Sequence, residues 1–358
     1  LGYDSRDNRT LHLDALRSSA NQPGNKTRME YDGLNRLIRT SRFLTSDGTG
    51  AGAPVGTIVT AQTWDHSSRL TSQIDNNGNA TTYTYDALNR RIATTYADGT
   101  AQRSTYDVHN NTITSTDANG NVAASTYDLR NHVIAKAITR GTGIDGTTFE
   151  NYRYDGLSRL VSARDDDSEI TRSYNSLSLV TRETLNGRTT TSIYDGVGNM
   201  LSCTYPGGRI ITTTYDELER KKTINDQFGP IASYDYIGPF RVERRDYANN
   251  SRTTYQYDGV QRIIRTTHTR DPLGVPAVID DRSYTWNQMY NKTSRQDLLP
   301  GGATHTYAYD SVYRLKSSTK TQTGQPTRNI QYGFDGVGNR TTVADGSDAG
   351  SYVMNAGT

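Results

Sequence analysis

The chain is almost devoid of cysteine. Cys203 is the single cysteine among 358 residues, so an internal disulfide is excluded and the fold is not held together by disulfides. Because one cysteine says nothing about redox environment, cysteine usage does not indicate the compartment. We expect Cys203 to be a small buried residue.

Large aliphatic residues and phenylalanine are also scarce. Leu, Ile, Val and Phe together make up about 17% of the sequence, a level at which an ordinary aliphatic core becomes doubtful. Disorder is nevertheless disfavoured, because the net charge is only +2 and the chain contains 25 Tyr. A buried Tyr ring removes on the order of 150 Å² from water, worth roughly 3 kcal/mol. Tyrosine is therefore expected to supply the core, and each buried hydroxyl needs a partner.

The sequence lacks an excess of charge of one sign and lacks long apolar runs. The net charge of +2 and the absence of a Lys/Arg run argue against a nucleic-acid partner. No apolar stretch approaches the roughly 18 residues that a membrane-spanning helix needs, so no membrane insertion is expected. Residue 1 is Leu without a basic and apolar leader; we expect a fragment of a longer protein, secreted or at the cell surface, with its export signal elsewhere.

What the sequence does contain is a repeat. An aromatic residue followed by Asp or Asn recurs fourteen times, and a fifteenth, degenerate copy lies at Tyr236. The basic period is 21 residues, and the longer spacings are insertions. The repeat aromatics are Tyr3, Tyr31, Trp64, Tyr85, Tyr106, Tyr127, Tyr154, Tyr174, Tyr194, Tyr215, Tyr236, Tyr257, Trp286, Tyr309 and Phe334.

The residues after each aromatic predict a tight turn. Asp and Asn side chains bond to backbone amides two residues further on, and the fourth residue after the aromatic is often Asn or Gly, which tolerate a left-handed backbone. The fifth residue is often Arg, and an aliphatic residue then begins the next strand. We expect the Asp and Arg to pair across the turn, and each aromatic to stack on its counterpart in the next repeat. The Asp and Arg positions proposed as structural are Asp32, Arg36, Asp86, Arg90, Asp155, Arg159, Asp216, Arg220, Asp258, Arg262, Asp310 and Arg314.

The second half of each repeat contains another turn, as in IDNNGNA (74–80), followed by Thr-rich and Tyr-rich segments such as TTYTYD (81–86). Each repeat then holds two strands of about six residues and two turns. Because a lone hairpin is marginal in water, successive repeats must pair. The predicted fold is all-β: tandem β-hairpin repeats forming one continuous spiralling antiparallel sheet, a solenoid or a hollow shell.

The domain organisation follows from the repeat. We expect residues 1–358 to be a single continuous array that contacts neighbouring repeats of the same longer chain. Insertions near 41–60, 140–150 and 269–282 are expected to project as loops at one edge, and they are the favoured places for specific contacts.

Three segments, YDGLNRLIRT (31–40), YDALNRRIATTYADGT (85–100) and YDGLSRLVSARDDD (154–167), resemble the YD or RHS repeat. The resemblance covers nearly the whole chain. It implies a long sheet that spirals into a shell, which in bacterial RHS and insecticidal toxin-complex proteins encloses a toxin, and in teneurins forms a barrel in an adhesion receptor. A DPLG motif at 271–274 echoes the DPxG motifs that follow such shells, but it lies in an insertion.

The favoured function is a non-catalytic wall segment of a shell around a toxin or other cargo, without cofactor or metal. An adhesin or wall-associated module that binds surface glycan or protein is the alternative. A polysaccharide-cleaving enzyme using Asp165, Asp166 and Asp167 is remote, because this triplet occupies a turn position. Calcium at the turns of Asp75 and Asp117 is disfavoured, since the twelve-residue ligand spacing is missing. The six His lie far apart, without metal or nucleophile spacing.

Overall fold

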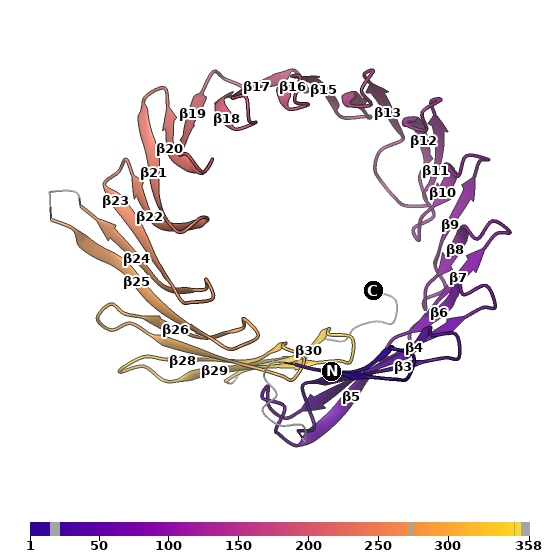
Figure 1. Ribbon diagram of the computed structural model, residues 1–358, viewed down its shortest axis with the longest axis horizontal. Helices are drawn as coiled ribbons and strands as arrows, with labels where there is room; N and C mark the ends of the chain where they lie inside the picture. Colours follow the sequence, from indigo (N-terminus) through magenta and orange to yellow (C-terminus); the bar gives the residue numbers. More distant parts are fainter. Residues whose placement is uncertain (15–21, 272–274, 347, 352–358) are drawn as a thin grey trace. The chain divides into compact units, whose positions relative to one another are not determined.

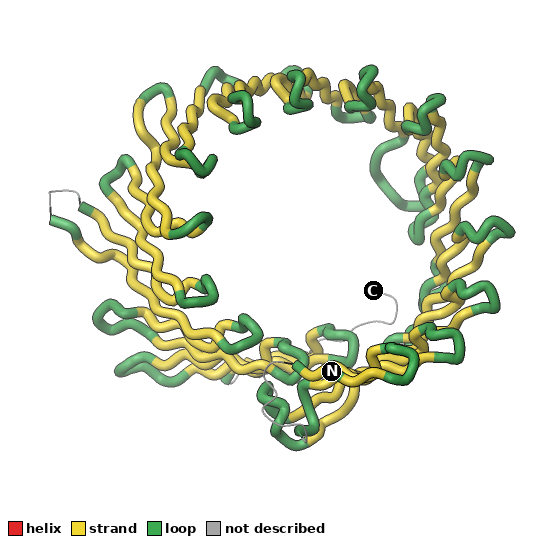
Figure 2. The backbone as a smooth tube through the Cα atoms, viewed as in Figure 1, coloured by secondary structure: helices red, strands yellow, loops and turns green. Residues whose placement is uncertain are grey.

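In the computed structural model, which describes residues 1–14, 22–271, 275–346 and 348–351, the chain is built from strands and tight turns (Figures 1 and 2). The strands belong to one antiparallel sheet of 31 strands. This confirms the all-β prediction and the antiparallel hairpin repeat. None of the described residues forms a helix long and apolar enough to cross a membrane.

The strands of the first hundred residues are β1 (Gly2–Tyr3), β2 (Arg9–Leu13), β3 (Lys26–Tyr31), β4 (Leu37–Thr45), β5 (Pro54–Trp64), β6 (Leu70–Ile74), β7 (Ala80–Tyr85) and β8 (Arg91–Thr95). Those of the middle are β9 (Ala101–Tyr106), β10 (Thr112–Thr116), β11 (Val122–Tyr127), β12 (Val133–Thr139), β13 (Phe149–Tyr154), β14 (Leu160–Arg164), β15 (Glu169–Tyr174), β16 (Val180–Leu185), β17 (Arg188–Tyr194), β18 (Met200–Thr204), β19 (Ile210–Tyr215), β20 (Lys221–Asp226), β21 (Gly229–Ile237), β22 (Arg241–Tyr247) and β23 (Ser251–Tyr257).

The last strands are β24 (Ile263–Arg270), β25 (Ala277–Trp286), β26 (Lys292–Asp297), β27 (Thr304–Tyr309), β28 (Leu315–Thr321), β29 (Arg328–Phe334), β30 (Arg340–Asp345) and β31 (Asp348–Ser351). The chain divides into two compact units. Unit 1 holds residues 1–100, 256–267 and 280–358, and unit 2 holds residues 101–255 and 268–279.

Within each unit the strands pair with their neighbours in sequence, so side chains alternate between the two faces of the sheet. In β7, for example, Tyr83 and Tyr85 are half-buried while Thr82 and Thr84 are exposed, as the two-residue period of a strand requires. Few of the described residues are almost fully buried: Asn25 and Thr253 are 1% exposed, and Thr45 and Ser311 are 2% exposed. Cys203 is buried, as predicted. The aromatic side chains are therefore partly exposed and do not form an enclosed core.

A β-bulge recurs at the repeat aromatic. Tyr31 lies opposite Leu37 whereas Glu30 lies opposite Arg39, which leaves Ile38 as the extra residue. The same shift occurs at Trp64, Tyr85, Tyr154, Tyr174, Tyr194, Tyr215, Tyr236, Trp286, Tyr309 and Phe334. Because a bulge re-aims a side chain and strengthens the local twist, it gives every repeat aromatic the same orientation.

The predicted insertions are only partly loops. Residues 41–45 and 54–60 extend strands β4 and β5, so the loop is confined to 46–53. Residues 140–148 do form a loop between β12 and β13, whereas 269–270 and 277–282 lie in β24 and β25. The prediction of loops was wrong for these strand residues, because β-branched and aromatic side chains such as Ile58 and Val59 favour a longer hairpin. The DPLG motif lies largely outside the described residues.

Candidate functional site

The turn that follows the repeat aromatic, here named the first turn, has one geometry in most repeats; the turn after Tyr236 differs, because β21 continues to Ile237. In the Tyr31 repeat the carboxylate of Asp32 accepts hydrogen bonds from the backbone amides of Leu34 (2.8 Å) and Arg36 (3.0 Å). Its second oxygen accepts from Arg36 Nε at 2.7 Å. Asn35 adopts a left-handed backbone with φ 63°. The Asp therefore specifies the turn through backbone bonds and fixes the Arg in the same step.

The same ion pair closes seven first turns. Each joins an Asp directly after the aromatic to an Arg four residues later, with nitrogen–oxygen distances of 2.6 or 2.7 Å. The pairs are Asp32–Arg36, Asp65–Arg69, Asp86–Arg90, Asp155–Arg159, Asp216–Arg220, Asp258–Arg262 and Asp310–Arg314. Sequence analysis proposed six of these pairs; Asp65–Arg69 follows the same pattern after a Trp.

The arginine also reaches the next repeat. Arg159 Nη1 donates to the carbonyl oxygen of Asn175 at 3.1 Å, and its guanidinium lies 4.6 Å from the ring centre of Tyr174. Equivalent bonds to the next turn are made by Arg36, Arg69, Arg220, Arg262 and Arg314. The planar guanidinium of arginine suits this position, because it can bond to two turns and cover an aromatic face at the same time.

This arrangement corrects the expectation that repeat aromatics stack on one another. Over Trp64, Tyr85, Tyr174, Tyr236 and Phe334 the group is the arginine of the preceding repeat, at 4.4 to 6.0 Å from the ring centre. One repeat contributes two strands about 4.8 Å apart, so equivalent rings are separated by about 10 Å. That distance exceeds the 4.5–7 Å of aromatic pairs, and the guanidinium occupies the space between them.

In ten repeats the polar atom of the aromatic side chain has the same partner, the carbonyl oxygen six residues after the aromatic of the preceding repeat. The bonds measure 2.6 to 3.1 Å. They join Tyr31 to Arg9, Trp64 to Leu37, Tyr85 to Leu70, Tyr127 to Thr112, Tyr174 to Leu160, Tyr194 to Val180, Tyr215 to Met200, Tyr236 to Lys221, Trp286 to Ile263 and Tyr309 to Lys292. Tyr and Trp thus serve equally well, because each carries a donor at the end of a flat ring.

Removing one of these hydroxyl groups is expected to lower stability modestly. Tyr194→Phe deletes the 3.0 Å bond to Val180 while keeping the ring, at a cost of about 1 kcal/mol. Urea unfolding measures this change. Tyr3 holds the same repeat position but is 57% exposed, so Tyr3→Phe is the control and should leave the midpoint unchanged. Equal midpoints for the two variants would contradict a stabilising role of the hydroxyl bond.

The left-handed position of the first turn is occupied by several residues that disfavour it. Asn35, Asn89, Asn110 and Asn131 suit the position as predicted, but Glu219 also has φ 60°. An L-residue other than Gly, Asn or Asp loses about 1 kcal/mol or more in this region. We therefore expect Glu219→Asn to raise the free energy of unfolding by about 1 kcal/mol, measured by urea titration. Asn89→Glu, the reverse change in another repeat, should lower it; a shift of the same sign in both variants would contradict the argument.

Four first-turn carboxyl groups, those of Asp32, Asp86, Asp155 and Asp216, have a lowered pKa. The side chain of Arg36 lowers the pKa of Asp32 from its ordinary value, and the backbone amide of Arg90 does so most for Asp86. The pKa values of Asp155 and Asp216 are lowered chiefly by hydrogen bonds from the side chains of Arg159 and Arg220. Each of these four carboxyl groups therefore binds its proton more weakly in the folded chain than in the unfolded chain.

This predicts acid sensitivity summed over the repeats. A carboxyl group with a lowered folded pKa stabilises the fold above its unfolded pKa of about 4, and this contribution is lost as pH falls toward the folded pKa. The urea midpoint is expected to be constant between pH 6 and 7 and to fall steeply below pH 4. Asp155→Asn should reduce both the stability at pH 7 and the dependence on pH. A midpoint that rises on acidification would contradict this account.

A second feature of unit 1 joins distant parts of the sequence. Ser311, 2% exposed, accepts a hydrogen bond from the backbone amide of Thr45 (2.9 Å) and donates to the carbonyl oxygen of Phe43 (3.2 Å). Asn25, 1% exposed, donates to the carbonyl oxygen of Gly48 at 3.0 Å. Lys316 Nζ donates to the carbonyl oxygen of Ser46 at 2.6 Å. We name this contact between residues 24–76 and 309–338 the seam.

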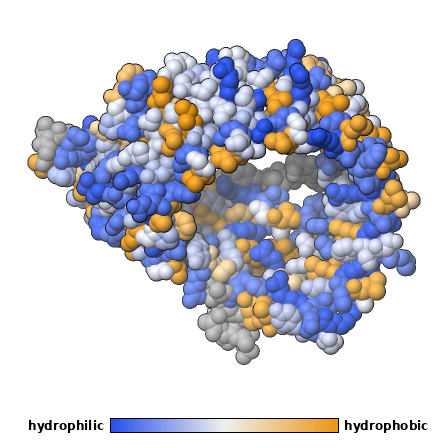
Figure 3. Space-filling model, turned by 45° about the horizontal axis from the view of Figure 1, so that its top comes forward, coloured by the Kyte–Doolittle hydropathy of each residue, from blue (hydrophilic) through white to orange (hydrophobic). Residues whose placement is uncertain are grey.

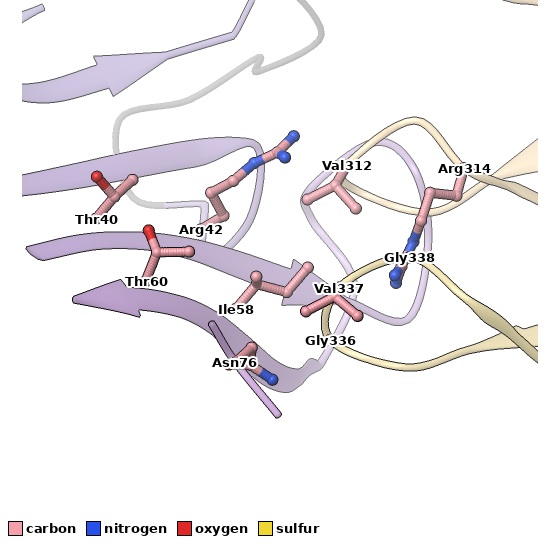
Figure 4. Close-up of a pocket in the computed structure, with 10 residues that line it drawn as sticks. All are labelled: Thr40, Arg42, Ile58, Thr60, Asn76, Val312, Arg314, Gly336, Val337 and Gly338. Atoms are coloured by element: carbon pink, nitrogen blue, oxygen red, sulfur yellow. The ribbon is translucent and has the colours of Figure 1, made fainter. Parts of the chain in front are cut away.

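A half-open pocket of about 420 Å³ lies at the seam (Figure 4). Ile58 on β5 faces Val312 and Val337, which lie at the tips of the first turns after Tyr309 and Phe334. The remaining lining residues are Thr40, Arg42, Thr60, Asn76, Arg314, Gly336 and Gly338. Close approach requires the glycine at 336, because a Cβ there would lie 1.9 Å from Asn76 Nδ2. Sequence reasoning missed the seam entirely, since its partners are more than 260 residues apart.

The candidates for chemistry act as turn residues. Asp165 accepts hydrogen bonds from the amides of Asp167 and Ser168, and Asp166 accepts from the amide and hydroxyl of Thr148. Asp117 is bonded to Asn121 in the same way as Asp32 is to Arg36. Within the described residues, no group of three or more His, Cys, Asp or Glu side chains is arranged to hold a metal ion.

The face shown in Figure 3 is mixed, with apolar side chains interspersed among hydrophilic ones. What the geometry supplies is a chain of links: Asp to Arg within a turn, Arg to the next turn, and the aromatic group back to the preceding repeat.

Comparison with known proteins agrees with this repeat. A family model described as RHS Repeat matches residues 64–101, and the recognition of RHS repeats in this chain is thereby confirmed. Comparison with curated proteins gives no match. The Photorhabdus luminescens Tc holotoxin pore with mutated TccC3 is similar over 95% of this chain and 19% of that chain, with a TM-score of 0.77 and 19% identity.

The crystal structure of TcdB2-TccC3 is similar over 91% of this chain, with a TM-score of 0.77 and 18% identity. The structure of TcdB2-TccC3-Cdc42 gives a TM-score of 0.76 and 19% identity over the same share. The chain spans 19% of the length of each of these structures. At this identity the likeness establishes the fold alone, a long antiparallel sheet.

Proposed function

We propose that this chain is a non-catalytic wall segment of a shell that encloses a toxin or other protein cargo, within a larger secreted or cell-surface protein. The observation that carries the proposal is the combination of linked repeats with the seam. Inter-repeat links recur from Tyr31 to Phe334, and hydrogen bonds join residues 266 positions apart in the sequence. Links between successive repeats and a contact between distant repeats are both expected of a wall that surrounds a cargo.

The residues proposed to carry this function are structural. The repeat aromatics tie each repeat to the preceding one, and the Asp and Arg of the first turns tie it to the following one. Stability in such an array is the sum of repeat and neighbour terms, so a wall can be long without a thick core. We assign no catalytic residue and no cofactor to this segment.

Cryo-electron microscopy of the intact parent protein tests the proposal. Walls built from these repeats with protein density inside would support encapsulation, and a cargo that resists protease until the wall is opened would support it independently. Walls around an empty interior, or an open sheet with both faces in solvent, would overturn it. An open sheet that binds surface glycan or protein through its insertions would instead favour the adhesin alternative.

A further inference from the structure

The pocket at the seam has two walls of different origin, both in unit 1 (Figure 4). One wall is a face of the β4–β5 hairpin. Thr40 lies opposite Thr60, and Arg42 lies opposite Ile58. Because directly paired residues project from the same face of a sheet, these four side chains point to one side of the hairpin. The other wall is made by two first turns, and Asn76 from the turn after β6 completes the lining.

The apolar part of the lining is aliphatic. Ile58 faces Val312 and Val337 across the pocket (Figure 4). None of the described residues that line the pocket is aromatic, so a sugar or a base would find no ring on which to stack. The volume of about 420 Å³ falls in the range of roughly 300–1,000 Å³ that is typical of small-ligand sites. The pocket is therefore suited to a small aliphatic group.

Four polar groups in the lining lack a partner in the protein. They form no hydrogen bond with any described residue, and they are the guanidinium of Arg42, the hydroxyl groups of Thr40 and Thr60, and Nδ2 of Asn76. The other end of the Asn76 amide is fixed, because its Oδ1 accepts a hydrogen bond from the backbone amide of Val59 at 2.7 Å. The pocket thus presents several hydrogen-bond donors beside an aliphatic surface, the combination that fixes the orientation of a bound ligand.

The charge of the lining is positive. Arg42 and Arg314 contribute it, and the described lining residues include neither Asp nor Glu. Arg314 is engaged already, because it donates to Asp310 at 2.6 Å and to the carbonyl oxygen of Asp335 at 2.7 Å. Arg42 is exposed and forms no ion pair with a described residue. Its guanidinium is free to bind an anion, and one planar guanidinium matches one carboxylate through two parallel hydrogen bonds.

We propose that the seam pocket binds an apolar carboxylate. Arg42 binds the carboxylate, and the hydroxyl groups of Thr40 and Thr60 lie on the same face of the hairpin to bind polar atoms beside it. The aliphatic part of the ligand lies between Ile58 and the two valines. A cation is disfavoured because the lining carries two arginines and no carboxylate. The site is separate from the wall function, so either proposal can fail without the other.

Two sources offer this chemistry: a free branched organic acid, and a polypeptide that ends in an aliphatic residue. Ligand-observed NMR titration distinguishes them. The probes are isocaproate with its amide, and a peptide that ends in leucine with either a free or an amidated terminus. Binding of both carboxylates assigns the site to organic acids in general, and binding of the peptide carboxylate alone assigns it to a chain terminus. Equal binding of the acids and their amides, or binding of neither carboxylate, overturns the proposal.

Two arginine variants test the charged end of the site. Arg42→Gln should weaken carboxylate binding at least tenfold, because it removes charge-assisted hydrogen bonds. Arg39→Gln is the matched control. Arg39 is also exposed on β4 but pairs with Ala61 and projects from the opposite face, so this variant should bind like the unaltered chain. Equal effects of the two substitutions would show that binding depends on net charge and would overturn the proposal.

Two valine variants test the aliphatic end. Val337→Ser should weaken binding of isocaproate or the peptide several-fold, because the ligand loses apolar contact area. Val197→Ser is its control: Val197 has the same turn position, also lies between two glycines, and is 67% exposed in unit 2. Circular dichroism establishes that the sheet is intact in each variant. Unchanged binding by Val337→Ser, or an equal loss in both variants, would overturn the proposal.

Discussion

Ser311→Leu is expected to open the seam and to lower the free energy of unfolding by about 3 kcal/mol. The serine side chain is 2% exposed and its hydroxyl serves the amide of Thr45 and the carbonyl group of Phe43. Leucine adds volume to a packed site and leaves both backbone groups without their partner, two effects that each cost roughly 1–3 kcal/mol. Hydrogen exchange should accelerate at Thr45, and urea unfolding should report the loss.

The matched control for the seam is Ala87→Leu. Ala87 occupies the same repeat position as Ser311, two residues after the aromatic, but is exposed. The same leucine there should change stability by less than about 0.5 kcal/mol. If Ser311→Leu left exchange at Thr45 unchanged, or if both variants were destabilised equally, the seam would not contribute to stability as described.

The repeat geometry could be predicted from sequence because its causes are local. The residues that specify the first turn all lie within seven positions: an Asp that bonds amides two and four residues away, an Asn with a left-handed backbone, and the aliphatic residue that begins the next strand. Because the pattern recurs fifteen times, it can be recognised although single copies depart from it. Tyr83 and Tyr85 could be placed on one face for the same reason. The need for a hydroxyl partner was predicted, but its identity was not, because the carbonyl group of Leu70 reaches Tyr85 only after the strands have paired.

The errors came from distances that a single strand does not reveal. Ring-on-ring stacking was expected from the recurrence of aromatics, yet the spacing of two strands separates equivalent rings by about 10 Å, and Arg159 fills the gap above Tyr174. The β-bulge at the repeat aromatic could not be predicted, because no residue type in the sequence marks it. The seam was unpredictable for another reason: Ser311 and Thr45 are ordinary turn and strand residues until the chain brings them together.

These links stabilise a sheet that lacks an enclosed core, and each link connects a different pair of groups. The side chains of the first-turn Asp–Arg pairs are 13–28% exposed. An ion pair that solvent reaches contributes little by itself, but the guanidinium also covers a ring and bonds the next turn. The hydroxyl bond runs in the opposite direction, to the preceding repeat. Each repeat is thus held from both sides, and a defect in one aromatic should be felt in its neighbours before it is felt elsewhere.

Tyr174→Ala should therefore cause the largest local defect, with a loss of about 3 kcal/mol. The substitution removes a half-buried ring, the 2.6 Å hydroxyl bond to Leu160, and the surface on which Arg159 lies; deletion of aromatic rings typically costs 3–5 kcal/mol when they are fully buried. Because stability in a repeat array is carried by nearest neighbours, amide exchange should accelerate in β14, β15 and β16 while β3 and β4 remain protected.

Comparison with a tyrosine that is not a repeat aromatic tests whether the loss of stability depends on the repeat position. Tyr205 lies in a second turn and is 46% exposed, so Tyr205→Ala should cost under about 1 kcal/mol and leave exchange in β14 to β16 unchanged. Uniform acceleration of exchange along the whole chain after Tyr174→Ala would contradict nearest-neighbour coupling, because it would mean that the repeats unfold as one cooperative unit. Confined acceleration would instead mean that a wall of this kind tolerates a damaged repeat while its other repeats stay folded.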